Sequence, residues 1–148
     1  RGIQFQARFA PIGAGRTKYQ IMSYFAPDTP RALNFEFDNL SSQQSPQDTT
    51  GDFTSDPKST IQLFQHLLNY AQAGLAQQHL DVLVIMTKSS QSPTNFKGRV
   101  RMFNALVTRM KNSHNLLVAR IDISPNDVCW MVASNQKWEP AFRKLNGR

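Results

Sequence analysis

The spacing of apolar residues in the first 37 positions indicates strands. Residues 3–9 and 32–37 alternate apolar and polar side chains with a period of two, which is typical of half-buried strands. Residues 19–25 form a third apolar segment, and Gly13-Ala14-Gly15 supplies a turn before it. Because short turns separate the three segments, residues 1–37 are predicted to form a three-stranded antiparallel meander.

The pattern changes after this meander. Residues 38–55 are polar and lack periodicity, so they are predicted to be a loop or linker, and the meander is either an extension of the following domain or a fragment of a neighbouring one. Asp56-Pro57 then supplies an N-cap and a proline at the first helical position. The helix predicted from there carries apolar residues at helical spacing, namely Ile61, Phe64, Leu68, Ala71 and Leu75.

A strand, a helix and a second strand follow. Residues 82–86 and 116–123 are the apolar strands, and Ser92-Pro93 opens the helix between them. This order predicts a βαβ unit whose two strands are parallel and buried on both faces. The expected fold class is therefore α/β, with the βαβ unit in a domain of residues 56–148. The apolar stripe of the connecting helix comprises Phe96, Val100, Phe103, Val107 and Met110.

Composition narrows the range of functions. The chain has 148 residues and 40% apolar residues, which suits one packed domain. Its net charge of +7 favours an acidic partner, namely nucleic acid, an anionic membrane face or an acidic protein, unless the charge serves only solubility. The apolar run Val82–Met86 is too short to span a membrane. Cys129 is the one cysteine, so neither an intrachain disulfide nor a zinc site of thiolates can form, and its apolar neighbours predict that it is buried.

One stretch resembles a known family. Residues 115–127, Asn-Leu-Leu-Val-Ala-Arg-Ile-Asp-Ile-Ser-Pro-Asn-Asp, are similar to a strand and turn of thioredoxin domains in the protein disulfide isomerase family. The similarity is greatest to multi-domain members of the endoplasmic reticulum. Residues 81–86 resemble the strand that leads into the active site, and Lys97 stands where the family has the lysine of Cys-x-x-Cys-Lys. The resemblance implies a thioredoxin-like domain over residues 56–148, in the endoplasmic reticulum or secretory pathway, with an intracellular location as the alternative.

This alignment also implies a lack of redox activity. Pro93-Thr94-Asn95-Phe96 stand at the Cys-x-x-Cys position, so both catalytic sulfurs are missing. The resemblance therefore implies a redox-inactive, non-catalytic module without a cofactor, which binds protein and serves in protein folding or quality control. In the family, substrates dock around this loop and a cis-proline, for which Pro140 could stand. The candidate binding residues, expected to take an acidic or polar peptide segment, are Thr87, Lys88, Ser89, Ser90, Pro93, Thr94, Asn95, Lys97, Trp138 and Pro140.

The alternative function is nucleic-acid binding or a place in a ribonucleoprotein assembly. Basic residues gather on or beside the second helix, where they could contact phosphates or simply form a solvated face: Lys97, Arg99, Arg101, Arg109 and Lys111. Aromatic side chains for base stacking are not expected beside them, because Phe96 and Phe103 belong to the apolar stripe.

Other sites remain as weaker alternatives. Asn39-Leu40-Ser41 is a candidate glycosylation sequon in the predicted loop. The segment after residue 86 also resembles the metal-binding loop of von Willebrand A domains, but Thr87 replaces its aspartate, so no metal is expected. Glu36 and Asp38 would suit a metal-dependent nuclease only with further carboxylates. The three histidines, which are spread along the chain without ligand spacing, are expected to be solvated.

Overall fold

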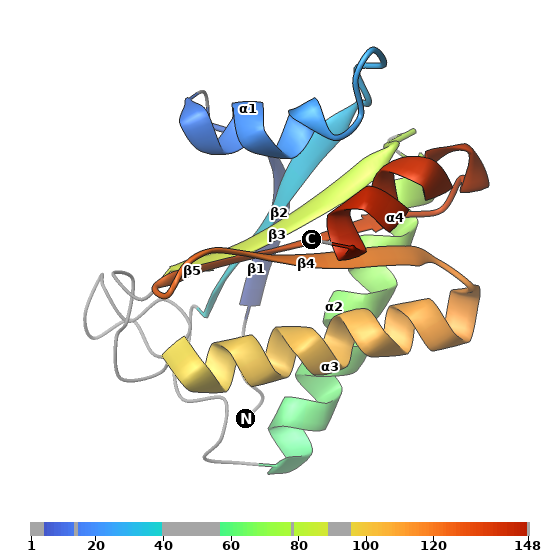
Figure 1. Cartoon of the computed structure of the whole chain (residues 1–148). Coiled ribbons are helices and arrows are strands. Elements are labelled where there is room, and N and C mark those ends of the chain that lie inside the picture. The colour runs from blue at the N-terminus through green and yellow to red at the C-terminus, as the bar shows by residue number, and fades with distance from the viewer. Residues whose placement is uncertain (1–4, 14, 40–56, 78, 89–95, 148) are drawn as a thin grey trace.

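The computed structural model describes residues 5–13, 15–39, 57–77, 79–88 and 96–147, which form one five-stranded sheet with helices on both faces (Figure 1). The fold is mixed α/β. In chain order the elements are β1 (Phe5–Pro11), α1 (Arg16–Ser23), β2 (Ala32–Asn39), α2 (Pro57–Gln77), β3 (Val82–Lys88), α3 (Phe96–His114), β4 (Leu117–Ser124), β5 (Asp127–Ala133), the 3₁₀ helix η3 (Gln136–Trp138) and α4 (Glu139–Asn146).

The strand order is β1-β2-β3-β5-β4, and every neighbouring pair is antiparallel except β2 and β3. Both β3 and β4 run antiparallel to β5, so they are parallel to each other, as predicted, but they are not neighbours. The predicted order of strand, helix and parallel strand is therefore present, but a turn at Pro125 and Asn126 folds β5 back between the two strands. The predicted burial of β4 on both faces was wrong, since β4 is an edge strand with Arg120 and Asp122 exposed.

The predicted N-terminal meander is wrong in its middle element. Residues 16–23 form the helix α1 rather than a strand, while β1 and β2 pair antiparallel, with Phe9 opposite Phe35. Ile21 and Phe25 are buried four residues apart, whereas Tyr19 is exposed, which is the spacing of one helical face packed on the sheet. The helix starts after Gly15, whose positive φ of 137° suits glycine.

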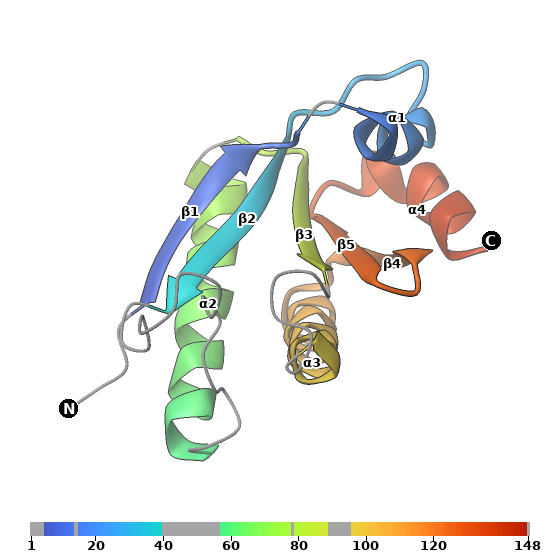
Figure 2. The same ribbon diagram turned by 90° about the vertical axis from the view of Figure 1, so that its left-hand side faces the viewer.

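The sheet separates two apolar cores. Helices α2 and α3 cover one face, and α1 and α4 cover the other (Figures 1 and 2). Strand β5 contributes to both, because Trp130 faces the α2–α3 side while Cys129 and Met131 face the α1–α4 side. This explains why β5 is an almost continuous apolar run, and it confirms the prediction that Cys129 is buried.

The first two strands belong to the same sheet as the rest. Residues 32–34 of β2 pair in parallel with residues 82–84 of β3, and beyond that point β1 and β2 diverge from β3 over α2 (Figure 2). The N–H of Arg31 donates to Oδ2 of Asp81 at 2.7 Å, which ties the starts of these two strands together. Asn39, predicted in a loop, is the last residue of β2 and lies opposite Phe5.

Helix α2 begins at Pro57, as the capping pattern predicted. Leu68, Ala71 and Leu75 of its predicted stripe are buried, and so are Phe103, Val107 and Met110 in α3. Within the described part of the chain, no helix is long and apolar enough to cross a membrane.

Candidate binding groove

The described members of the predicted binding set lie at two different ends of the sheet. Ser89, Ser90, Pro93, Thr94 and Asn95 lie outside the described residues. Thr87 and Lys88 are the last residues of β3, and Lys88 pairs with Asp127 at the start of β5. Trp138 and Pro140 follow the other end of β5, so they lie at the opposite end of the strands.

Trp138 is part of the core rather than a surface residue. Its side chain is buried, and its ring centroid lies 5.6 Å from that of Phe25 in an edge-on contact. Pro140 is exposed in the first turn of α4. Neither residue therefore joins Thr87 and Lys97 in a common docking surface.

Arg99 does not belong to the exposed basic face that was predicted on α3. Arg99 is buried, and its Nε donates a hydrogen bond to Oγ1 of Thr87 at 2.8 Å. Its guanidinium carbon also lies 5.9 Å from the ring centroid of Phe96. Arg99 lies three residues after Phe96 and four before Phe103, so it belongs to the buried side of the helix. The exposed cations of this face are Lys97, Arg101, Arg109 and Lys111.

Two of these cations line a groove between α3 and the β4–β5 hairpin. The groove has a volume of about 370 Å³. Its apolar wall comes from the first turns of α3 and from the hairpin, and its charged lining consists of three cations and one carboxylate, a net charge of +2. The lining residues are Phe96, Lys97, Val100, Arg101, Arg120, Asp122, Ser124, Pro125 and Val128.

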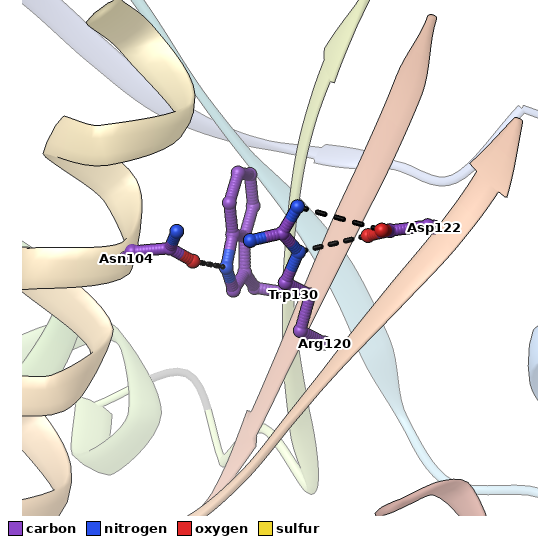
Figure 3. A network of polar contacts seen from close by, with 4 residues as sticks. All are labelled: Asn104, Arg120, Asp122 and Trp130. Carbon is purple, nitrogen blue, oxygen red and sulfur yellow. Dashed lines mark hydrogen bonds and ion pairs between the residues drawn. The ribbon is translucent and has the colours of Figure 1, made fainter. Parts of the chain in front are cut away.

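A network of polar contacts holds Arg120 in place (Figure 3). Its Nε donates to Oδ1 of Asp122 at 2.8 Å, and its guanidinium carbon lies 5.9 Å from the ring of Trp130. The indole N–H of Trp130 donates in turn to Oδ1 of Asn104 on α3 at 2.8 Å. Because the ion pair is exposed, it adds little stability, on the order of 0–1 kcal/mol. Its effect is to orient the Arg120 side chain across Trp130.

Cys129, the three histidines and Glu36 do not line the groove. Burial raises the pKa of Cys129 from 9.0 to about 12, so its thiol stays protonated. His66, His79 and His114 are exposed, as expected for solvated histidines. Glu36 forms an ion pair with Arg8 at 3.1 Å on the far strands. Among the described residues, no three His, Cys, Asp or Glu side chains are grouped as metal ligands.

Sequence reasoning missed the contribution of β4 to this site. Arg120 and Asp122 were assigned to a buried parallel strand, although they are the polar positions of an alternating segment. That alternation was the available signal for an exposed strand. The groove can offer an anionic ligand three positive side chains beside an apolar wall.

Comparisons of the chain with protein-family models, with curated proteins and with solved structures found no match.

Proposed function

We propose that this domain is a non-catalytic binding module that takes an acidic segment of a partner protein in the groove between α3 and β4. The observation that carries the proposal is the apolar wall of Phe96, Val100 and Val128 beside the exposed cations Lys97 and Arg101. Such a site gains free energy from buried apolar side chains and from charge complementarity together.

The electrostatics of the groove favour an anionic ligand. Lys97 lies in the first turn of α3, where the unpaired N–H groups of a helix add positive potential. Arg101 lies one turn further along, and Arg120 faces both from β4. Asp122 offsets one of these charges through its pairing with Arg120.

Nucleic acid is the second candidate, and Phe96 is the observation in its favour. The residue is half-buried and lines the groove beside the cations, whereas the sequence placed it wholly in the apolar stripe. A base could stack on this ring. A phosphate backbone, however, would leave the exposed parts of Val100 and Pro125 uncovered, and a peptide side chain would cover them.

Fluorescence anisotropy separates the two candidates. The probes are a labelled peptide of alternating Glu and Val residues and a labelled oligouridylate, both titrated with the whole chain at several salt concentrations. We expect the peptide to bind, and the double variant Lys97→Glu/Arg101→Glu to weaken its binding about tenfold or more, because two attractive charges become repulsive.

The matched control is Arg109→Glu/Lys111→Glu, which makes the same charge change on the same helix away from the groove. Its peptide affinity should stay within about twofold of that of the unmodified chain. Arg109 lies eight residues beyond Arg101 in α3, about 12 Å along the helix axis, which exceeds the Debye length of about 8 Å at physiological ionic strength. Tighter binding of oligouridylate than of peptide, weakened equally by both double variants, would assign the face to nucleic acid instead.

The likeness to redox-inactive thioredoxin domains, and the endoplasmic reticulum location that it implies, remain part of the proposal. They rest on the sequence of residues 115–127. Binding in the groove does not depend on them, because it follows from the placement of the side chains.

A further inference from the structure

Strand β4 is an edge of the sheet. It has one strand neighbour, β5, within the described ranges, and its other side faces away from the sheet (Figure 2). An edge strand presents main-chain N–H and C=O groups that another extended segment can pair with.

The hydrogen bond of Asn146 identifies which main-chain groups point outward. Nδ2 of Asn146 donates to the carbonyl of Val118 at 3.1 Å, so this carbonyl points away from β5. In an antiparallel pair, residues alternate between bonding to the partner and pointing outward. Arg120 and Asp122 are two and four residues further along β4, so their main-chain groups also point to the open edge.

Each side of this edge carries a cavity. The groove of about 370 Å³ receives the side chains of Arg120 and Ser124 on the α3 face. On the opposite face, a second cavity of about 250 Å³ lies between β4 and α1, where Ile121 and Ile123 face Tyr19. The two cavities lie on opposite faces of the sheet, and Asp122, between Ile121 and Ile123, lines both of them.

We infer that the partner segment binds as an added strand along the edge of β4, which extends the sheet by one strand. This inference rests on the function proposed above and specifies how the ligand lies. Successive side chains of an added strand point to opposite faces. One set of alternate side chains enters the basic groove and the other set enters the cavity beside α1.

Charge complementarity determines the chemistry of the ligand. The α3 face presents Lys97, Arg101 and Arg120, so the side chains entering that groove are acidic. The cavity on the α1 face is lined by Tyr19, Gln20, Ile21, Ser23 and Tyr24 and by the carboxylate of Asp122, so it suits apolar or small polar side chains and disfavours acidic ones. The ligand is thus an extended peptide with acidic residues at every second position. A second copy of this basic chain would bring like charges together along the same edge.

Peptides methylated on alternate main-chain amides test this arrangement. Four probes are compared by anisotropy: the alternating Glu-Val peptide, a block peptide of the same composition, and alternating peptides methylated on the Glu amides only or on the Val amides only. In an added strand, one set of amides bonds to β4 and the other set points away. We expect methylation of one set to weaken binding about tenfold, through the loss of hydrogen bonds to the outward carbonyls of Arg120 and Asp122, while methylation of the other set changes it less than about twofold.

The set of amides whose methylation weakens binding shows whether the added strand runs antiparallel or parallel to β4. Arg120 has outward main-chain groups and a side chain on the α3 face, so an antiparallel peptide would bond through its Glu amides and a parallel one through its Val amides. The block peptide should bind more weakly than the alternating peptide. Equal affinities for all four probes, with the loss in Lys97→Glu/Arg101→Glu retained, would overturn strand addition and leave the binding function standing.

A pair of variants tests the edge from the side of the protein. Arg120→Pro removes an outward N–H, which a proline on an edge strand can lack without breaking the β4–β5 ladder. Arg120→Ala removes the same side chain and keeps the N–H. We expect Arg120→Pro to bind the alternating peptide about threefold or more weakly than Arg120→Ala does. If Arg120→Pro fails to fold, the methylated peptides alone decide. A concentration-dependent dimer that Arg120→Ala retains and Arg120→Pro loses, and that excess peptide does not dissociate, would assign the edge to a second copy and overturn the inference.

Discussion

Arg99 and Thr87 form a buried side-chain hydrogen bond, with 2.8 Å between Nε of the arginine and Oγ1 of the threonine. The bond joins the first turn of α3 to the end of β3. Because the donor is charged and the surroundings exclude water, loss of the acceptor leaves a desolvated N–H group.

Thr87→Val should therefore lower the free energy of unfolding by about 1.5–3 kcal/mol, since the shape is kept and only the hydroxyl is lost. Urea denaturation followed by circular dichroism measures this. Thr108→Val makes the same chemical change at an exposed position of α3 and should cost less than about 0.5 kcal/mol. Equal losses in the two variants would mean that the hydroxyl of Thr87 contributes nothing specific.

Gly74 allows α2 to approach β1 closely. A Cβ atom at this position would overlap the ring of Phe9, which is held between Phe35 and Tyr70 at centroid distances of 5.5 and 5.1 Å. Gly74→Ala should thus destabilise the fold by about 1–3 kcal/mol, although alanine is the better helix former.

The control for Gly74 is Gly98 in α3, where an added Cβ would meet nothing within 4 Å. Gly98→Ala should stabilise the protein by up to about 1 kcal/mol. Thermal denaturation of both variants shows whether the first is destabilised and the second stabilised. A stabilised Gly74→Ala variant would show that α2 lies further from β1 than the structure places it.

Phe103 anchors α3 to the sheet. Its side chain is buried, and its ring lies 5.5 Å from that of Trp130. Phe103→Ala should cost about 3–5 kcal/mol, because a large buried side chain is lost and a cavity remains. Tyr19→Ala, at a position that is 77% exposed, should change stability by less than about 0.5 kcal/mol. A loss below about 1 kcal/mol in Phe103→Ala would contradict the packing of α3 on β5.

The burial of Cys129 makes stability depend on pH in the alkaline range. Its pKa is raised from 9.0 to about 12 by desolvation. The unfolded chain loses this proton above about pH 9 while the folded chain keeps it, so the free energy of unfolding falls as the pH rises from 9.0 towards about 12.

The slope from this one thiol approaches about 1.4 kcal/mol per pH unit within that range. Cys129→Ala lacks the thiol, so its stability should fall less steeply in urea denaturation at a series of alkaline pH values. Parallel curves for the two proteins would contradict the raised pKa. Below pH 9 the contribution of the thiol is fully present and the two curves should run parallel.

Local periodicity predicted α2, α3 and the burial of Cys129, because each depends on side chains close together in the chain. It was wrong for α1, since Tyr19, Ile21 and Phe25 in a short apolar segment fit both a strand and a helix. Arg99 was counted as a surface charge because the residue type was considered before its position on the helix.

The groove could not be predicted in the same way. It requires α3 to lie beside β4, and that depends on the insertion of β5 between β3 and β4. This pairing joins residues far apart in sequence, such as Ile85 with Trp130, and no local pattern encodes it. Lys97 and Arg120 therefore line one groove because of the topology of the sheet.

The shared core of α1 and α4 has a consequence for the order in which the chain is made. Phe25 packs against Trp138 and Phe142, at ring distances of 5.6 and 5.9 Å. On the ribosome, α1 emerges long before either partner exists, so its apolar face stays exposed while the intervening strands and helices are synthesised. This face of the sheet closes only when α4 leaves the exit tunnel, and until then the nascent chain presents an apolar surface on which chaperones can act.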